Sequence, residues 1–218
     1  MNIFNINNIL TSTLGYDLSY VEFFGTLFGL VSVWFAAKEN ILTWSTGLIN
    51  VICFFAIFYQ VNLYSDMFLQ IYFFITSIYG WITWRKQNNK AKPISFLTNK
   101  QRIITLFIIV CSTIILGFFV KNIHLLFPKL FSIPASYPFA DTFIAVSSVI
   151  ATILLAKRIL ENWILWITID IICVFVYAKK NIYFIAIEYA IFFLLASYGL
   201  FLWIKSTNYG NRLSTREI

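Results

Sequence analysis

Long apolar segments, separated by short polar ones, run through the chain from residue 20 onward. A helix needs about 20 apolar residues to cross the hydrocarbon core of a bilayer, and seven segments approach or reach that length. They lack the two-residue alternation of outer-membrane barrel strands, so their backbone hydrogen bonds must form within helices. The pattern therefore predicts an all-α integral membrane protein with seven transmembrane helices, at residues 20–37, 41–59, 66–84, 102–120, 138–156, 163–178 and 182–204.

The second half of this pattern repeats the first at a shift of 119 residues. Tyr79-Gly80-x-x-x-Trp84 returns as Tyr198-Gly199-x-x-x-Trp203. Glu39-Asn40-x-x-x-Trp44 matches Glu161-Asn162-x-x-x-Trp166 if three residues are inserted. Three transmembrane helices leave the chain on the opposite side of the membrane, and the single helix at 102–120 returns it to the side on which it began. Both three-helix units then enter the membrane from the same side. We therefore expect two parallel three-helix repeats joined by a linker helix, a 3+1+3 plan, with the substrate site near mid-membrane between them.

The predicted helices divide the chain into five parts. These are an N-terminal interfacial segment (1–19), the first three-helix repeat (20–84), a central part with a basic loop, the linker helix and an external loop (85–137), the second repeat (138–204) and a cytoplasmic tail (205–218).

Composition and charge set the environment and the orientation. The chain is 60% hydrophobic and 11% charged, against about 45–50% and about 25% in soluble domains. Of the 16 Lys and Arg residues, four lie on the side of the N-terminus and twelve on the side of the C-terminus. Positive residues accumulate on the cytoplasmic side, so we expect the N-terminus outside and the C-terminus inside. The net charge of +7 is then topological: the basic loop faces lipid headgroups, and no nucleic-acid partner is expected.

Asp170 is the clearest candidate for chemistry, because an ionisable side chain within a span is costly and therefore a functional candidate. Trp163, Trp166, Asp170 and Tyr177 follow helical spacing and share one face. A carboxylate beside indole rings suits an organic cation, since a cation over an aromatic face gains about 0.5–2 kcal/mol. Trp163, at the start of its span, fits an interfacial anchor equally well.

Carboxamides and one further carboxylate complete the candidate substrate-binding set. Asn50 and Gln70 can donate and accept hydrogen bonds at once, which fits recognition of an amide on a substrate. Bonding between neighbouring helices is the alternative use for both. Trp44 lies on the same helix as Asn50, and Glu188, nearer an interface, is expected to pair with Lys179 or Lys180.

Enzymatic and metal chemistry find little support in the sequence. Asp170 and Glu188 could serve as acid and base of a membrane-embedded enzyme, but no nucleophile or metal motif accompanies them. No metal site and no cofactor are expected, and no Gly-rich phosphate loop is present. A purely structural or receptor-like bundle is the third alternative. The internal repeat, with polar residues on facing units, argues against it.

Several of these motifs resemble the PnuC-type nicotinamide riboside transporters. They are Gly47-Leu48-Ile49-Asn50, Leu69-Gln70, Ile78-Tyr79-Gly80-Trp81 and Glu161-Asn162-Trp163-Ile164-Leu165-Trp166. The resemblance extends from about residue 15 to residue 204. It implies a distant relation to SWEET sugar transporters and uptake of nicotinamide riboside, an NAD precursor, by facilitated diffusion and alternating access. A cytoplasmic nicotinamide riboside kinase would trap the product, and a homo-oligomer is compatible with the sequence.

The resemblance also gives roles to the candidate residues. Trp163 and Trp166 would stack on the pyridinium ring, and Gln70 and Asn50 would bind the carboxamide or the ribose hydroxyls. Asp170 departs from the family pattern, in which Asn is common at this position. A carboxylate there would strengthen cation binding or favour another cationic vitamin such as thiamine.

Overall fold

The computed structural model describes residues 4–13, 15–61, 64–86, 93–127 and 134–214. Seven α-helices run through these residues, and each is long and apolar enough to cross a membrane. This confirms the predicted all-α membrane protein with seven transmembrane helices. The helices are α1 (Tyr20–Ala37), α2 (Leu42–Gln60), α3 (Tyr64–Lys86), α4 (Asn99–Leu126), α5 (Pro138–Ala156), α6 (Glu161–Lys179) and α7 (Tyr183–Ser214).

A small β-hairpin precedes α1. Its antiparallel strands are β1 (Ile9–Thr13) and β2 (Tyr16–Ser19), and Gly15, with a φ of 74°, supplies the left-handed turn residue between them. Ser19 then caps α1 by accepting a hydrogen bond from the Glu22 N–H. Residues 1–19 were expected to form an interfacial segment, and the hairpin was not predicted because strands this short carry little alternation.

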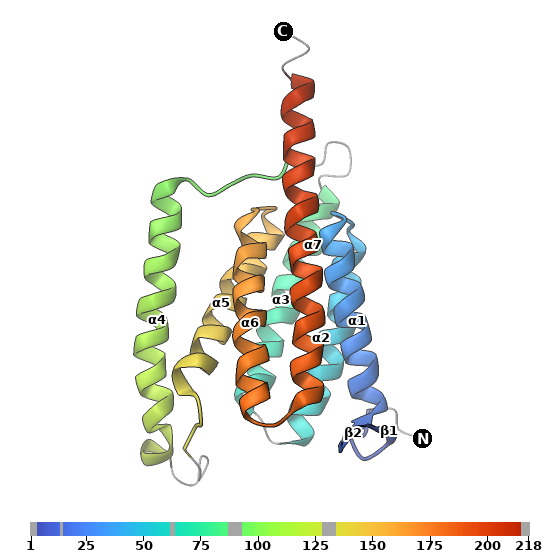
Figure 1. The fold of residues 1–218 in the computed structure, drawn as a ribbon, viewed down its shortest axis with the longest axis vertical. Helices are drawn as coiled ribbons and strands as arrows, with labels where there is room; N and C mark the ends of the chain where they lie inside the picture. Colours follow the sequence, from blue (N-terminus) through green and yellow to red (C-terminus); the bar gives the residue numbers. More distant parts are fainter. Residues whose placement is uncertain (1–3, 14, 62–63, 87–92, 128–133, 215–218) are drawn as a thin grey trace.

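Six of the helices close into a ring. α1 packs against α2 and α7, α3 packs against α2 and α5, and α6 packs against α5 and α7. α4 stands outside this ring, beside α5, as the green helix at the left of Figure 1 shows. Its surface is apolar and open, with Ile103 and Phe107 more than two-thirds exposed, which suits contact with lipid.

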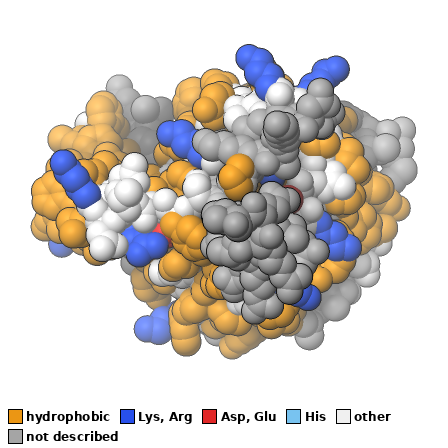
Figure 2. Space-filling model, turned by 90° about the horizontal axis from the view of Figure 1, so that it is seen from above, with side chains coloured by type: hydrophobic (Ala, Val, Ile, Leu, Met, Phe, Trp, Pro, Cys, Tyr) orange, Lys and Arg blue, Asp and Glu red, His pale blue; other side chains and the backbone are white. Residues whose placement is uncertain are grey.

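The two ends of the bundle differ in charge. The α1–α2 and α5–α6 turns, the end of α3 and the C-terminus lie at the upper end in Figure 1, and the hairpin lies at the lower end. We call the upper end the basic end, because Lys38, Arg85, Lys86 and Lys157 stand at or beside the helix termini there. Figure 2, which looks down on this end, shows Lys and Arg side chains spread around it.

The two halves repeat at one constant shift of 119 residues. α2 begins at Leu42 and ends at Gln60, and α6 begins and ends 119 residues later. The preceding turns share the same backbone bonds: the N–H of Asn40 donates to the Phe35 oxygen, and the N–H of Ile159 donates to the Leu154 oxygen, both at 2.9 Å.

This register corrects the alignment expected from the sequence. At the constant shift, Trp44 corresponds to Trp163 rather than to Trp166, and Glu39 corresponds to Arg158. Glu39 and Arg158 both have positive φ angles, of 54° and 56°. The expected three-residue insertion is therefore wrong. The letters Glu-Asn recur in both halves, but they stand at different places relative to the turn.

Four tryptophans form a buried layer near the basic end. We call Trp44, Trp84, Trp163 and Trp203 the tryptophan layer. Trp44 meets Trp84 edge to face at 5.4 Å, and Trp163 meets Trp203 in the same way at 5.6 Å. Two corresponding glycines permit this packing: a Cβ added at Gly80 would lie 2.4 Å from the Trp44 ring, and one at Gly199 would lie 2.6 Å from the Trp163 ring.

The described residues before α4 form backbone hydrogen bonds with the α5–α6 turn, and none of these bonds joins them to the corresponding α1–α2 turn. The Ser95 N–H donates to the Arg158 oxygen, and the Leu160 N–H donates to the Ser95 oxygen, each at 3.0 Å. Both carboxylate oxygens of Glu161 lie 3.1 Å from the Leu97 N–H, and Arg102 contacts the same carboxylate at 2.8 Å. The first half carries Leu42 at the position of Glu161, so it lacks this carboxylate.

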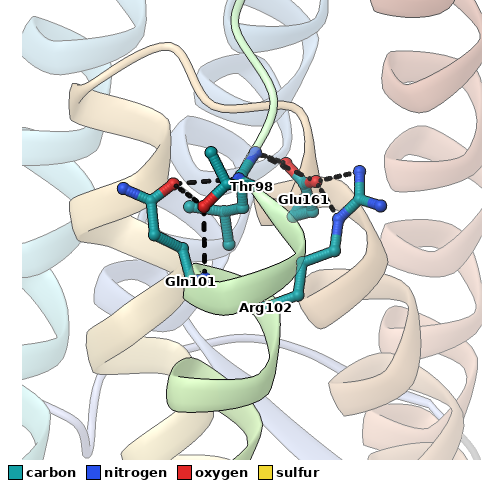
Figure 3. A network of polar contacts seen from close by, with 5 residues as sticks. Thr98, Gln101, Arg102 and Glu161 are labelled. Atoms are coloured by element: carbon teal, nitrogen blue, oxygen red, sulfur yellow. Dashed lines mark hydrogen bonds and ion pairs between the residues drawn. The ribbon is translucent and has the colours of Figure 1, made fainter.

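Figure 3 shows how this connection joins the start of α4. Thr98 caps the helix and exchanges hydrogen bonds with Gln101, a capping box that fixes the first turn of α4. Arg102 stands one turn further on and reaches Glu161 at the start of α6. The start of α4 is therefore anchored to the start of α6 at the basic end.

Candidate functional site

A cavity of about 330 Å³ lies inside the ring of six helices. Its walls combine apolar and aromatic side chains with a few polar groups, as ligand pockets commonly do. The lining residues come from α1, α2 and α3 of the first half and from α5, α6 and α7 of the second. The cavity therefore lies between the halves, where a substrate site was expected from the sequence.

Seven of the eight candidate residues line this one cavity: Trp44, Asn50, Gln70, Trp163, Trp166, Asp170 and Glu188. Tyr177 is not among the lining residues. Its ring stacks on that of Tyr189 at 5.5 Å, and Tyr189 does line the cavity. The helical spacing placed Tyr177 on the right face of α6, but two turns beyond Asp170 the neighbouring ring of α7 intervenes.

Asp170 is buried in the wall, with 4% of its surface exposed. No hydrogen bond or ion pair joins its side chain to another residue in the part of the chain that the structure describes. Removing a charge from water without a partner costs several kcal/mol. A cation bound in the cavity would offset that cost.

Glu188 lies on α7 and reaches across to the first half. Its Oε1 atom accepts a hydrogen bond from the Thr26 hydroxyl of α1 at 3.1 Å. The expected pairing with Lys179 or Lys180 is wrong, because the side chain turns into the ring of helices and lines the cavity. Lys180 instead stands within 6 Å of the ring centres of Tyr137 and Tyr177.

The two carboxamides differ in how far the protein already uses them. The Asn50 Nδ2 atom donates to the Gly25 carbonyl of α1 at 2.8 Å, which is the helix-to-helix use that the sequence left open. Its Oδ1 atom accepts no hydrogen bond from the described residues. Gln70 lines the cavity as well, and none of the described groups hydrogen-bonds its side chain. Gln70 is therefore the freer group for contact with a ligand.

The tryptophans occupy two levels. Trp44 and Trp163 belong to the tryptophan layer, are 3% and 1% exposed, and close the cavity toward the basic end. Burial of this kind excludes the interfacial-anchor alternative for Trp163. Trp166 is less buried and stands one turn further into the cavity on the helix that carries Asp170, so it is the indole best placed beside that carboxylate.

Several lining residues were not among those expected from the sequence. Tyr189 and Phe192 of α7 line the cavity, and so do Ser32, Thr43 and Thr152. The constant shift holds the signal for some of them: Tyr189 corresponds to Gln70, and Phe192 corresponds to Phe73. Ser32 and Thr43 also bond each other's backbone oxygens, which ties α1 to α2.

The hairpin reaches α7 at the opposite end of the bundle. The Tyr16 ring stacks on Phe184 at 5.0 Å, and its hydroxyl donates to the Glu22 carboxylate. Burial, and then the bond to Glu22, raise the pKa of Tyr16 above its ordinary value. Tyr16 is therefore a neutral donor in the physiological pH range.

Taken together, seven helices long and apolar enough to cross a membrane, six of which surround a ligand-sized cavity with a few polar groups in its walls, define a multi-pass membrane protein with a candidate site for a small solute. The sequence model of the family described as "Nicotinamide mononucleotide transporter" matches residues 19–205. The chain belongs to this family.

Individual relatives agree with the family. The chain is 33% identical to the nicotinamide riboside transporter PnuC of Escherichia coli (strain K12), over 94% of this chain and 95% of that one. It is 22% identical to the riboflavin/roseoflavin transporter RibM of Streptomyces davaonensis, over 82% of each. A solved structure titled "Crystal structure of the Vitamin B3 transporter PnuC" matches the fold with a TM-score of 0.66 at 22% identity, covering 87% of this chain and 82% of that one.

Proposed function

We propose that this protein carries nicotinamide riboside across the membrane, by facilitated diffusion and alternating access around the cavity. The observation that carries the proposal is Asp170, a buried carboxylate in the cavity wall without a partner among the described residues. Nicotinamide riboside has a positively charged pyridinium ring, which supplies the missing charge. The name of the relative in Escherichia coli supports the same substrate.

The rest of the cavity supports a specific orientation of that substrate. Trp166 lies on the helix of Asp170, one turn away, so a pyridinium ring could stack on its indole beside the carboxylate. Gln70 and the free oxygen of Asn50 stand on the first half, where they fit the carboxamide or the ribose hydroxyls. In this arrangement Trp163 is not a second stacking surface. It belongs to the wall that closes the cavity toward the basic end, which we call the floor.

Thiamine is the second candidate, because it is also a flat cationic vitamin. The observation that favours it is the carboxylate itself, which departs from the amide expected at this position of the family. The carboxamide group separates the two substrates, since thiamine has none.

The remaining features of the proposal concern the membrane. The excess of Lys and Arg at the basic end supports a cytoplasmic position for that end in the bacterial inner membrane, with the N-terminus outside. The constant shift between halves supports two parallel three-helix units joined by α4, and with them the distant relation to SWEET transporters. Coupling to a cytoplasmic nicotinamide riboside kinase would make uptake unidirectional.

Equilibrium binding to the purified protein in detergent tests the substrate. Nicotinamide riboside, thiamine, riboflavin and nicotinamide would be compared by isothermal titration calorimetry. We expect nicotinamide riboside to bind tightest, and nicotinamide weakest because it lacks both the charge and the ribose. Tighter binding of thiamine would transfer the function to that vitamin, and tighter binding of riboflavin would remove the role of Asp170 as a partner for a cation.

A further inference from the structure

Glu39 and Arg158 are corresponding residues of the two halves, and they meet. Each follows the last residues of a long helix, α1 or α5, in the left-handed conformation of the turn. The Arg158 Nη1 atom donates to the Glu39 Oε2 atom at 3.0 Å. Two positions related by the internal repeat therefore carry opposite charges, and their contact lies where the two halves face each other at the basic end.

Arg158 is held on more than one side. Only 5% of its surface is exposed, and its guanidinium carbon lies 4.3 Å from the centre of the Trp84 ring. Burial lowers the pKa of Arg158, while the nearby Glu39 raises it. A guanidinium remains charged at neutral pH under such shifts, so the contact is an ion pair combined with a cation–π contact.

Two indole bonds cross between the halves at the same level. The Trp84 Nε1 atom of α3 donates to the Ala156 oxygen of α5, and the Trp203 Nε1 atom of α7 donates to the Ala36 oxygen of α1, each at 3.1 Å. Both acceptors are at the ends of helices, where carbonyl groups lack partners within the helix. The two donors correspond under the shift of 119 residues, and the acceptors lie one position out of register, because Ala156 corresponds to Ala37 and not to Ala36.

These crossing contacts coincide with the floor of the cavity. Ala36, Trp44, Trp163 and Ala196 line the cavity and also belong to the buried apolar cluster at the basic end. Trp84 and Trp203 pack against that floor from behind. For a solute to leave the cavity through the basic end, the two halves must separate here, and the ion pair and both indole bonds must break.

We propose that the Glu39–Arg158 pair is a lock that holds the cavity closed at the basic end, and that opening at this end requires its rupture. The proposal rests on the proposed transport function for its purpose. The two residues are positioning residues in this scheme, because they act through the tryptophan layer and do not touch the substrate. Weakening the lock should therefore shift the population toward the state open at the basic end.

Cysteine labelling measures that population directly. Ser77 lines the cavity on α3, one turn before Gly80, and is 7% exposed. A Ser77→Cys variant would be treated with a membrane-impermeant thiol reagent in vesicles of both orientations. Peptide mass spectrometry would read residue 77 separately from the native Cys53, Cys111 and Cys173. Adding Glu39→Gln or Arg158→Gln should raise labelling from the basic end at least about fivefold and leave labelling from the other end unchanged or lower.

The internal repeat offers a sharp rescue. The double change Glu39→Arg with Arg158→Glu exchanges corresponding residues, so the arginine at position 39 would face Trp203, the counterpart of Trp84. Labelling should fall back toward the level of the parent. Lys38→Gln is the matched control, because Lys38 stands beside Glu39 but contacts Trp34 at 4.3 Å and does not cross between the halves.

Unchanged labelling in both single variants, or labelling in the exchanged pair as high as in the singles, would overturn the lock. If a single variant does not fold, Trp203→Phe removes one crossing donor and should raise labelling in the same direction. Binding of nicotinamide riboside to the parent is measured separately. Failure there would count against the substrate, whereas the labelling result decides the lock.

Discussion

The two walls of the cavity occupy corresponding positions but carry different chemistry. Eight lining residues of the first half have their counterparts, 119 residues later, in the lining of the second half. Trp44 and Trp163 are identical, whereas Val51 corresponds to Asp170 and Gln70 corresponds to Tyr189. Both walls carry aromatic rings and hydroxyl groups, but the carboxamides of Asn50 and Gln70 lie on the first wall, whereas the carboxylates of Asp170 and Glu188 lie on the second. Corresponding positions thus share their packing near the basic end, while the charged and amide groups of the two walls differ.

Neutralising Asp170 should cause the largest loss. Asp170→Asn removes the charge and keeps the shape, so the affinity for nicotinamide riboside should fall about 100-fold or more, because breaking a buried ion pair typically costs about 3–5 kcal/mol. Titration calorimetry measures the change. Glu188→Gln is the matched control: its side chain already has a partner in Thr26, and its effect should stay below about tenfold. Small and equal effects of the two changes would remove Asp170 from the site.

Adding a methyl group at Gly80 or Gly199 tests the tryptophan layer, where the two halves pack in the same way. Gly80→Ala and Gly199→Ala would each place a Cβ within 3 Å of an indole ring. Each should destabilise the protein by about 1–3 kcal/mol, as overpacking of a close-packed core does. Thermal unfolding in detergent should show similar decreases for both variants. A large decrease at one glycine and none at the other would show that the tryptophan layer is not equivalent in the two halves.

Gln70 tests the cavity walls, where the two halves carry different polar groups. Gln70→Leu should weaken nicotinamide riboside about tenfold and thiamine much less, because only the former has a carboxamide to leave unpaired. Tyr189→Phe, at the corresponding position of the other wall, should change the ratio of the two affinities little. Competition binding measures that ratio. The reverse order, with thiamine weakened more, would overturn the assignment of Gln70 to the carboxamide.

The connection to α4 should matter least. Glu161→Gln weakens the ion pair with Arg102, which is half exposed, and should cost less than about 1 kcal/mol of stability. Arg102→Gln should give a similar decrease in the unfolding temperature, and high salt should reduce both effects. A decrease as large as that of Gly199→Ala would mean that the anchored turn, absent from the first half, supports the second half far more than its contacts indicate.

The helices and the shift between halves were readable from the sequence, because both depend on long patterns. Seven apolar segments and the repeated Tyr-Gly-x-x-x-Trp motif can be recognised even where the boundaries of single helices are uncertain from the sequence. The α1–α2 and α5–α6 turns did not. There the letters Glu-Asn suggested one register, whereas backbone geometry places Glu39 opposite Arg158. Residue identity is a weak guide in a turn whose conformation is fixed by backbone bonds.

The residues of the candidate site that could be predicted from the sequence were those whose side chains are most costly to bury in a membrane. A carboxylate in the middle of a span has to face something other than lipid, so Asp170 could be placed without coordinates. The direction of Glu188 and the displacement of Tyr177 depend on contacts with α1 and α7, which helical spacing within one segment cannot reveal. The short hairpin before α1 left no periodic signal at all.

Charge recognition is tested most directly by comparing nicotinamide riboside with its reduced, uncharged dihydro form. The two share the ribose and the carboxamide and differ in the positive charge of the ring. Titration of both into the purified parent protein should show the cation bound at least about tenfold more tightly, and Asp170→Asn should remove most of that difference. Equal affinities in the parent, or a preference that persists in full after Asp170→Asn, would contradict a cavity built around a buried carboxylate that binds a cation.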